Sequence, residues 1–342
     1  MIAITALMLS VLSPNLLACP SKNKTVLPCH HLNNGQKNSA NKVVGRDYYL
    51  HVPKILSNNA PLVFAFHGSG GDKASAMIKY SGLVKLGSKE KFITVFPQGL
   101  PDHQNKPHWS DGRETFKWHY DHVDDIAFVK EIMQDLKQKN IQYDQQRVYG
   151  IGISNGGVFA LYSACKAPNL FKAIGTVVAT MSKEMLVQEC ASKSLPAKPV
   201  MMIFGDQDKT MPYKTEGEMG RAGSHSSAAI GIPIFASLSF WSKNNRCHEK
   251  TAAQWLKNSQ NAVVIDQVKK VPRTWRRKEQ TSYVEIQSSG CKYPVRYLEA
   301  RMAGHRWHKK NHPKGITDFT KKFRVSREFD SQQKLWDFIS QF

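Results

Sequence analysis

The chain has 342 residues, of which 41% are hydrophobic and 22% charged, and beyond the N-terminus it has no stretch of about 20 uninterrupted apolar residues, so we expect no membrane span in the body of the protein. No internal repeat is present, so the length predicts a single α/β domain, which we place at residues 46–342. The net charge of +21 predicts electrostatic association with an anionic polymer or membrane surface. No recognised nucleic-acid-binding motif accompanies this charge, and solvated surface lysines account for it more simply than nucleic-acid binding does.

The N-terminal segment predicts export. Residues 1–18 are apolar and end in Leu16-Leu17-Ala18, with a small residue at the expected cleavage site of a signal peptide. The segment lacks the usual Lys or Arg near its start. Because Cys19 follows directly, the pattern also suits a lipoprotein signal, after which Cys19 would carry lipid. Residues 19–45 are polar and predict a tether with little structure. We therefore expect a secreted or periplasmic protein, with lipid anchoring left open.

Apolar runs predict the strands and helices that follow. The expected strands are Tyr48–Val52 at an edge of the sheet, Leu62–His67, Lys91–Phe96, Arg147–Ile151, Lys198–Gly205 and Pro294–Glu299. A helix is expected at residues 124–139, and a final docking helix at 331–342. Asp124 or Asp125 is well placed to cap the first helix, which is a simpler interpretation than a catalytic pair. The alternation predicts a doubly wound, mostly parallel sheet with helices on both faces.

The segment Gly152-Ile153-Ser154-Asn155-Gly156 lies between an expected strand and the apolar run Val158–Tyr162. A G-x-S-x-G between a strand and a helix is typical of a nucleophile elbow, in which a sharp turn exposes the serine hydroxyl at the carboxyl edge of the sheet. Only small residues fit around such a turn. The segment therefore makes Ser154 the candidate nucleophile.

A glycine-rich segment, His67-Gly68-Ser69-Gly70-Gly71, follows the expected strand that ends at His67. An oxyanion formed in acyl transfer needs two backbone N–H donors, one after the nucleophile and one from a loop of this kind. Asn155 and Ser69 are the candidate donors. Taken alone, the glycine-rich segment suits an ordinary flexible turn better.

A serine nucleophile needs a histidine base that a carboxylate holds in the right tautomer. Asp206 and Asp208 follow one expected strand, and His305 follows another. In a doubly wound sheet these positions meet at one edge. The chain order Ser, Asp, His is that of an α/β-hydrolase. This reasoning leaves the choice between the two aspartates open.

With these segments the chain resembles the secreted esterases of the polyhydroxybutyrate depolymerase group, which also contains feruloyl and acetylxylan esterases. The resemblance runs from about residue 46 to the C-terminus, and it is carried by His67–Gly71, Asp124–Phe128, Gly152–Gly156, Asp208–Tyr213 and Gly304–Trp307. It implies an α/β-hydrolase fold. The ester hydrolysis that we expect needs no metal or organic cofactor. The resemblance also makes Ser154 the nucleophile, His305 the general base and acid, and Asp208 the orienting carboxylate. Asp206 then becomes a loop-capping carboxylate.

The resemblance further implies two disulfides, Cys165 with Cys190 and Cys247 with Cys291. Six cysteines, an even number, fit an oxidising compartment. Cys19 and Cys29 remain as a third, local pair. If Cys19 carries lipid, Cys29 loses that partner.

Two departures from the group alter the rim of the site. Phe204-Gly205 stands where members commonly have His-Gly, and Trp307-His308-Lys309 stands where they have Trp-Pro-Gly. Trp307 and Trp109 are candidate substrate-binding residues. The aromatic residues of the loop 101–123 and of the segment 248–287 suit either a pocket lining or a cover for the core. A metal site is not expected, because His119, Asp121 and His122 match no zinc spacing.

The expected function is therefore that of an exported serine ester hydrolase acting through a covalent acyl-enzyme on polyhydroxybutyrate-type or other short-chain hydroxyalkanoate esters. A feruloyl or acetylxylan esterase acting on plant polysaccharide esters is the alternative. A non-catalytic α/β-hydrolase binding scaffold is the alternative from another class. The presence of Ser154, Asp208 and His305 together argues against the scaffold.

Overall fold

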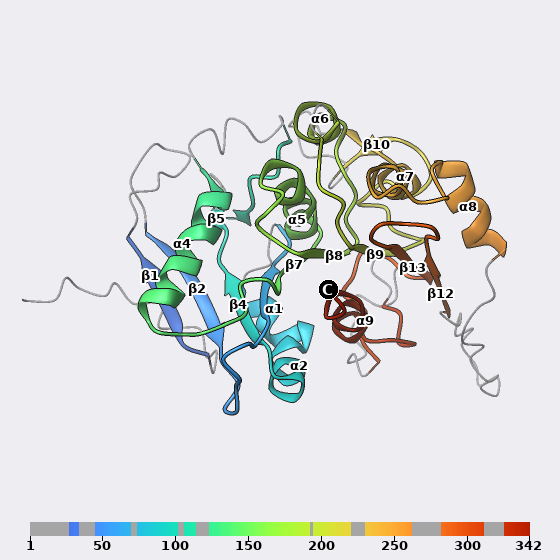
Figure 1. Ribbon diagram of the computed structural model, residues 1–342. Helices are drawn as coiled ribbons and strands as arrows, with labels where there is room; N and C mark the ends of the chain where they lie inside the picture. Colours follow the sequence, from blue (N-terminus) through green and yellow to red (C-terminus); the bar gives the residue numbers. More distant parts are fainter. Residues whose placement is uncertain are drawn as a thin grey trace, which may run out of the picture.

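The computed structural model describes residues 27–33, 45–69, 74–101, 106–113, 123–191, 194–219, 230–261, 282–310 and 325–342. Their centre is a nine-stranded sheet (Figure 1), whose strands in spatial order are β1 (Cys29–Leu32), β2 (Arg46–His51), β4 (Ile93–Pro97), β3 (Leu62–Phe66), β7 (Val148–Ile153), β8 (Ala173–Val177), β9 (Val200–Gly205), β13 (Val295–Arg301) and β12 (Ser282–Gln287). Two small hairpins pair β5 (Leu100–Pro101) with β6 (Pro107–His108) and β10 (Gly217–Glu218) with β11 (Ile230–Gly231).

The helices are α1 (Ala74–Ser81), α2 (Leu83–Glu90), α4 (Asp125–Gln138), α5 (Asn155–Lys166), α6 (Lys183–Met185), the π-helix η2 (Leu186–Cys190), α7 (Ile234–Asn244), α8 (Ala252–Asn261) and α9 (Ser331–Ile339). All the strands and helices expected from the sequence are present, with ends shifted by a few residues. The six central strands, from β4 to β13 in the spatial order, are parallel to one another. Their carboxyl ends therefore share one edge, as the α/β-hydrolase fold requires.

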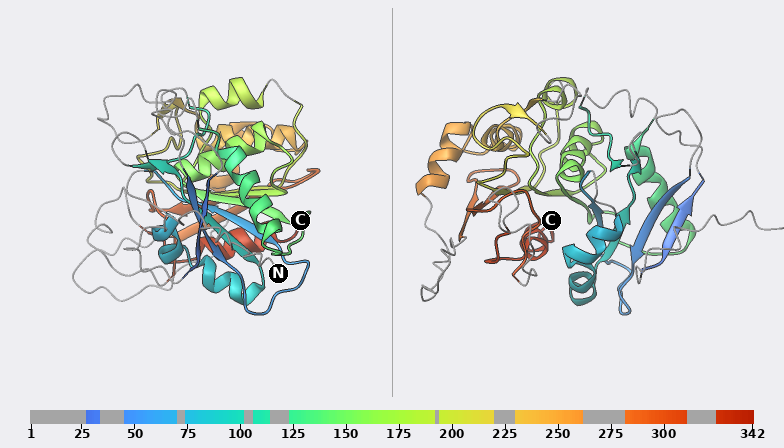
Figure 2. Two further views of the ribbon diagram at one scale, coloured as in Figure 1. Left: turned by 90° about the vertical axis from the view of Figure 1, so that its left-hand side faces the viewer. Right: turned by 180° about the vertical axis from the view of Figure 1, so that it is seen from behind.

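Helices cover both faces of the sheet (Figures 1 and 2), and the side chains of β3 show why. Successive strand residues point to opposite faces. Leu62, Phe64 and Phe66 pack in one core with α4, α5 and α7. Val63 and Ala65 pack in the other core with α1, α2 and α9. All five residues are fully buried, which explains the uninterrupted apolar run in the sequence.

The amino-terminal edge of the sheet differs from the expectation. Residues 29–32 were expected to lie in an unstructured tether, but they form β1, which pairs antiparallel with β2. As a result β2 is not an edge strand. The sequence of β1 has no run of apolar residues, and its contacts with β2 are made by histidines. The ring centroids of His30 and Tyr48 are 4.8 Å apart, and Nδ1 of His31 lies 2.6 Å from Asp47 Oδ1. These contacts depend on the partner strand, so the local sequence does not reveal them.

Both implied disulfides are present among the described residues. Cys165 at the end of α5 is bonded to Cys190 at the end of η2. Cys247, just after α7, is bonded to Cys291, just before β13. Cys29 is also disulfide-bonded, whereas Cys19 and the expected signal peptide lie outside the described residues. None of the helices in the described part of the chain has the length and apolar character needed to cross a bilayer.

The C-terminal helix α9 docks on β8 and β9. Leu335 is fully buried, and β8 makes room for it with a glycine, because a Cβ on Gly175 would lie 2.8 Å from Leu335 Cδ2. Beside it, Trp336 stacks on Phe92 with ring centroids 4.1 Å apart. The last helix is therefore part of the core and not an appendage.

We expect Leu335→Ala to lower the free energy of unfolding by about 2–5 kcal/mol, because it removes a buried side chain and leaves a cavity. Ile55→Ala is the control, since Ile55 is 73% exposed and its loss should change stability by less than about 0.5 kcal/mol. Urea titration monitored by tryptophan fluorescence measures both values. Equal stability of the two variants would contradict the docking of α9.

Candidate active site

Ser154 stands on the turn between β7 and α5. Its backbone has φ 53° and ψ −127°, a conformation that residues other than glycine rarely adopt. The glycines around it are required by close approach: a Cβ on Gly152 would lie 2.3 Å from Gly156 O. The sequence therefore folds here into the nucleophile elbow that the G-x-S-x-G pattern predicts.

The start of α5 also lies against the end of β3. A Cβ on Gly156 would lie 2.3 Å from the carbonyl oxygen of His67. The first backbone N–H groups of a helix have no partner within the helix and carry its positive dipole end. Asn155 is the first residue of α5, and Ser69 is two residues beyond His67. The two candidate donors therefore lie on α5 and on the loop that follows β3, and these two elements are in contact.

His305 lies in the loop after β13 and reaches Ser154 and Asp208 together. Its Nε2 is 2.9 Å from Ser154 Oγ, and its Nδ1 is 2.7 Å from Asp208 Oδ2. With the proton on Nδ1, the ring donates to the carboxylate and leaves Nε2 free to accept from the serine hydroxyl. The imidazole is 13% exposed and the Asp208 side chain is fully buried. Three segments that are far apart in the sequence therefore form one hydrogen-bonded chain.

The Asp208 carboxylate is fixed by the loop that carries it. Its Oδ1 accepts hydrogen bonds from the backbone N–H groups of Thr210 at 2.7 Å and Met211 at 3.0 Å. The other oxygen remains for His305. These two backbone donors hold the carboxylate in the orientation that the imidazole needs.

Asp206 lies elsewhere. It accepts hydrogen bonds from the backbone of Met302 and Ala303, and burial, followed by the nearby Glu299 carboxylate, raises the pKa of its carboxyl group. It lines a pocket of about 460 Å³ whose other lining residues are Gln207, Tyr213, Lys214, Leu256, Ser259, Gln260, Glu299 and Arg301. Ser154, Asp208 and His305 are not among them. The geometry thus places Asp208, and not Asp206, beside the histidine.

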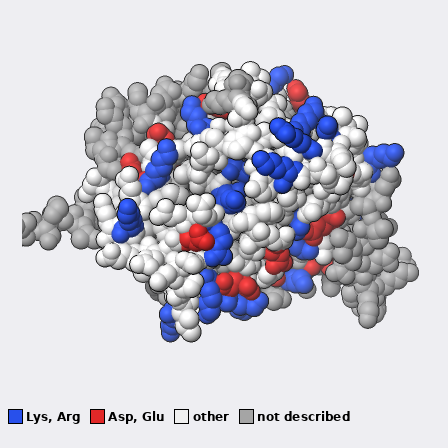
Figure 3. Space-filling view, viewed as in Figure 1, with Lys and Arg blue, Asp and Glu red and all other residues white. Residues whose placement is uncertain are grey.

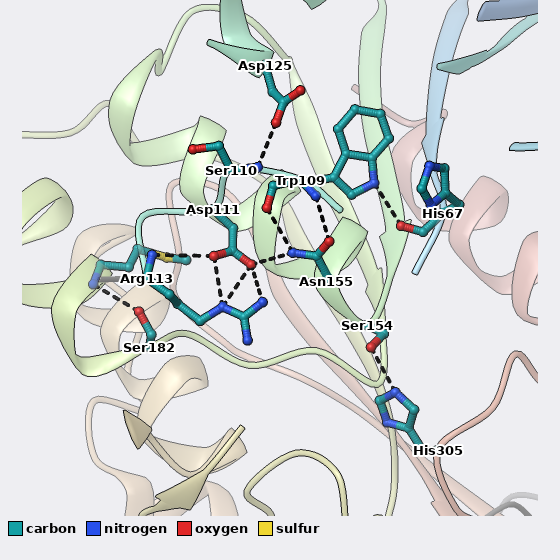
Figure 4. Close-up of polar contacts among 11 residues, drawn as sticks. His67, Trp109, Ser110, Asp111, Arg113, Asp125, Ser154, Asn155, Ser182 and His305 are labelled. Carbon is teal, nitrogen blue, oxygen red and sulfur yellow. Dashed lines mark hydrogen bonds and ion pairs between the residues drawn. The ribbon is translucent and has the colours of Figure 1, made fainter. Parts of the chain in front are cut away.

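The side chain of Asn155 is held by a loop that sequence reasoning did not connect with the site (Figure 4). Its Oδ1 accepts from the backbone N–H of Trp109 at 2.8 Å, and its Nδ2 donates to Trp109 O at 3.1 Å and to Asp111 Oδ2 at 2.6 Å. Asp111 in turn forms a two-point ion pair with Arg113. In the sequence, Asp111-Gly112-Arg113 has the features of a solvated turn, and no local signal connects it with Asn155.

The same loop is anchored by Asp125, at the start of α4. Asp125 Oδ2 accepts from the backbone N–H of Ser110 at 2.6 Å, and Oδ1 lies 2.5 Å from Nη2 of Arg46. Burial raises the pKa of the Asp125 carboxyl group, while the Arg46 guanidinium opposes this shift. The preceding Asp124 caps α4 by accepting from the backbone N–H of Ala127. The two aspartates therefore serve as a cap and a loop anchor, as the simpler interpretation held.

His67 is a structural histidine at the end of β3. Its Nδ1 donates to Gly68 O at 2.7 Å, and its Nε2 accepts from the backbone N–H of Gly99 at 2.9 Å. Burial lowers the pKa of His67 to about 4. The ring is therefore neutral near pH 7 and fixes the start of the glycine-rich loop, of which residues 70–73 lie outside the described residues.

The two candidate substrate-binding tryptophans are buried. Trp109 is fully buried and its indole N–H donates to His67 O at 2.9 Å. Trp307 is 4% exposed and its indole N–H donates to Gln332. Both rings contact protein atoms, which favours the core-covering interpretation. Trp255, from the second loop region, is also fully buried.

Several residues singled out in the sequence lie outside the described residues. They are Phe116, Trp118, His119, Tyr120, Asp121, His122 and Trp275. Within the described ranges, no three His, Cys, Asp or Glu side chains are grouped as a metal ion would require.

The chain is similar in sequence to known proteins that are named as esterases or as a depolymerase. The chain is 26% identical over 171 residues to "Putative esterase NocK" of Nocardia uniformis subsp. tsuyamanensis, covering 49% of this chain and 46% of that protein. It is 29% identical over 129 residues to "Poly(3-hydroxyalkanoate) depolymerase C" of Paucimonas lemoignei (36% of this chain, 28% of that protein). It is 24% identical over 209 residues to "Feruloyl esterase B" of Thermothelomyces thermophilus (60% and 68%). The chain thus spans less than half the length of the first two relatives.

The match to a family description is longer than any of these. It extends over residues 46–309, from the start of β2 to just beyond the loop of His305, and so includes Ser154 and Asp208 as well. The description reads "Putative esterase". The chain, whose fold is of the α/β-hydrolase type, belongs to the Esterase family.

Proposed function

We propose that the protein is a serine ester hydrolase that works through a covalent acyl-enzyme. The observation that carries this proposal is the hydrogen-bonded chain from Ser154 through His305 to Asp208, with the serine on a strained turn at the carboxyl edge of the sheet. Membership of the Esterase family supports the same reaction. The non-catalytic scaffold would have no need of this strained and hydrogen-bonded arrangement.

In the proposed first half-reaction, Nε2 of His305 takes the proton of Ser154 as Oγ attacks the ester carbonyl carbon. Asp208 stabilises the imidazolium through Nδ1–H. The backbone N–H groups of Asn155 and Ser69 donate to the oxyanion. When the tetrahedral intermediate collapses, the proton on His305 passes to the departing alcohol. Water then attacks the acyl-enzyme by the same steps and releases the acid.

For the substrate, we propose short-chain hydroxyalkanoate esters, with feruloyl or acetylated polysaccharide esters as the alternative. The depolymerase and feruloyl esterase relatives support one choice each. Because the proposed catalytic groups are common to both reactions, selectivity must come from the groups that hold the acyl and alcohol parts in the transition state. Relative kcat/KM values therefore distinguish hydroxyalkanoate esters from feruloyl or acetylated polysaccharide esters as the substrate.

We further propose that the protein is exported. The two described disulfides and the bonded Cys29 support an oxidising compartment. The choice between a lipid on Cys19 and a bridge to Cys29 stays a prediction. Mass analysis of the mature N-terminus distinguishes the two.

Association with an anionic polymer or membrane surface also stays a proposal, and one surface supports it. Around the buried Asn245 lie four exposed or half-buried cations without an ion pair to a described residue: Lys172, Lys243, Arg246 and Lys292. Lys198 lies buried among them, with its Nζ donating to Phe171 O. Figure 3 shows Lys and Arg gathering over α7 on this face. Burial, followed by repulsion from Lys172, lowers the pKa of Lys198 to about 8. We call this set the Asn245 cationic surface.

We expect Ser154→Ala to fold normally and to lose turnover of p-nitrophenyl butyrate by a factor on the order of 10³ or more, because no other group replaces the nucleophile. Ser57→Ala, at an exposed serine, is the control and should keep wild-type turnover. Initial rates and circular dichroism spectra of both variants make the comparison. Near-normal turnover in Ser154→Ala would falsify the proposed mechanism.

The position of the two aspartates gives a second prediction. Asp208→Asn should lower kcat by about 10⁴, since the amide no longer favours the required tautomer of His305. Asp206→Asn should have a much smaller effect, because Asp206 hydrogen-bonds the backbone of Met302 and Ala303 instead. Measured kcat values for the two variants decide. The reverse order would move the orienting role to Asp206.

Relative kcat/KM values on a substrate panel test the proposed ester. We expect 3-hydroxybutyrate oligomers and p-nitrophenyl acetate or butyrate to be cleaved in preference to methyl ferulate and acetylated xylan, with little action on amides. A large preference for methyl ferulate would replace the hydroxyalkanoate proposal and keep the triad. No cleavage of any ester would favour the binding scaffold.

A further inference from the structure

We infer that Asp111, held in place by Arg113, is a positioning residue that sets the geometry of the oxyanion hole through the side chain of Asn155. This inference rests on the proposed ester-hydrolase function. It goes beyond it by assigning a role to a buried ion pair outside the triad. Both side chains are nearly inaccessible, Asp111 at 0% and Arg113 at 4% exposure.

The side-chain amide of Asn155 has no N–H donor left for a substrate. Its two donors go to Trp109 O and Asp111 Oδ2, and its oxygen accepts from the Trp109 N–H. An N–H donor on one side and two acceptors on the other permit a single amide orientation. The residue is 1% exposed. Asn155 therefore contributes to the reaction through its backbone N–H alone, and the side chain acts as a clamp on the first turn of α5.

The same loop also contacts the other half of the oxyanion hole. The indole N–H of Trp109 donates to the carbonyl oxygen of His67, two residues before Ser69. Figure 4 shows Trp109 between His67 and Asn155. The two proposed backbone donors come from different elements, so their separation depends on what joins those elements. Besides the direct contact at Gly156, the segment Trp109–Asp111 makes that connection.

Aspartate suits position 111 because three side-chain donors converge on its carboxylate. The Nε of Arg113 lies 2.8 Å from Oδ1, and Nη2 lies 2.6 Å from Oδ2, which also accepts from Asn155 Nδ2. A bidentate ion pair of this kind fixes the plane of the carboxylate. It also neutralises a buried negative charge that would otherwise oppose an oxyanion forming near Asn155. The Arg113 guanidinium therefore offsets the negative charge of the Asp111 carboxylate, which accepts from Asn155 Nδ2.

The test compares Asp111→Ala with Asp111→Asn. Removing one oxyanion donor costs about 10²–10³ in kcat, and a displaced donor costs less, so we expect Asp111→Ala to lower kcat by about 10–100-fold with KM changed by less than about twofold. Asp111→Asn keeps an oxygen that can accept from Asn155 Nδ2. It should recover most of the lost kcat.

A transition-state analogue supplies a readout that a merely structural role would not move. A phenylboronic acid adds to the serine and places an oxygen in the oxyanion hole, so its inhibition constant should rise by the same factor as kcat/KM falls. Leu335→Ala is the stability control, since it weakens the core on the face of the sheet opposite to α5 and should leave both quantities unchanged below its melting temperature. If Asp111→Ala fails to fold, Arg113→Met takes its place, with the same expected loss of kcat.

Unchanged kcat in Asp111→Ala and Arg113→Met would overturn the inference. A loss confined to KM, or a boronate affinity that stays constant while kcat falls, would overturn it as well. These outcomes are distinct from failure of the proposed function, because they presuppose that turnover depends on Ser154. Turnover retained by Ser154→Ala would refute the ester-hydrolase proposal and this inference together.

Discussion

The close approach of α5 to the ends of β3 and β7 is the constraint on which the site depends. At this point the chain leaves a buried strand and enters a helix with no connecting loop, so the backbone of Ser154 is forced into a conformation with positive φ. The approach is possible only because Gly152 and Gly156 lack side chains. It brings the first free N–H groups of a helix next to the end of β3. Strain at Ser154 is therefore maintained by the packing of two sheet strands and a helix, and not by local preference.

The parallel order of the central strands brings the remaining groups to the same place. Asp208 and His305 follow β9 and β13, which are neighbours in the sheet, and β8 alone separates β9 from the strand that precedes Ser154. The side chains therefore meet although His305 is 97 residues from Asp208 and 151 residues from Ser154 along the chain. Backbone donors fix Asp208, and Asp208 fixes His305. Each group in this series is oriented by the one behind it, which is the arrangement that a preorganised site needs.

Much of this arrangement could be predicted from the sequence, because the glycines around Ser154 and the apolar strands before Asp208 and His305 are local signals. The strand β1 and the pair Asp111–Arg113 could not. The Cys-His-His-Leu of β1 has no alternating pattern, and its order comes from contacts with Asp47 and Tyr48. Asp111 and Arg113 stand in a polar turn, and only the folded chain shows that Asn155, 44 residues from Asp111, donates to the Asp111 carboxylate. Likewise, burial of Trp109 and Trp307 depends on residues distant in sequence.

The Asn245 cationic surface lies at the opposite edge of the sheet from the proposed catalytic groups. Lys172, Lys198 and Lys292 come just before β8, β9 and β13, whereas Ser154, Asp208 and His305 come just after their strands. If the proposed association with a negatively charged support takes place through this surface, Ser154 faces away from the support. Such an orientation suits the capture of small, diffusing esters from the surrounding liquid and leaves the support itself beyond reach. Adhesion and hydrolysis would then involve different molecules. The charged support would retain the enzyme, and the dissolved esters would be its substrates.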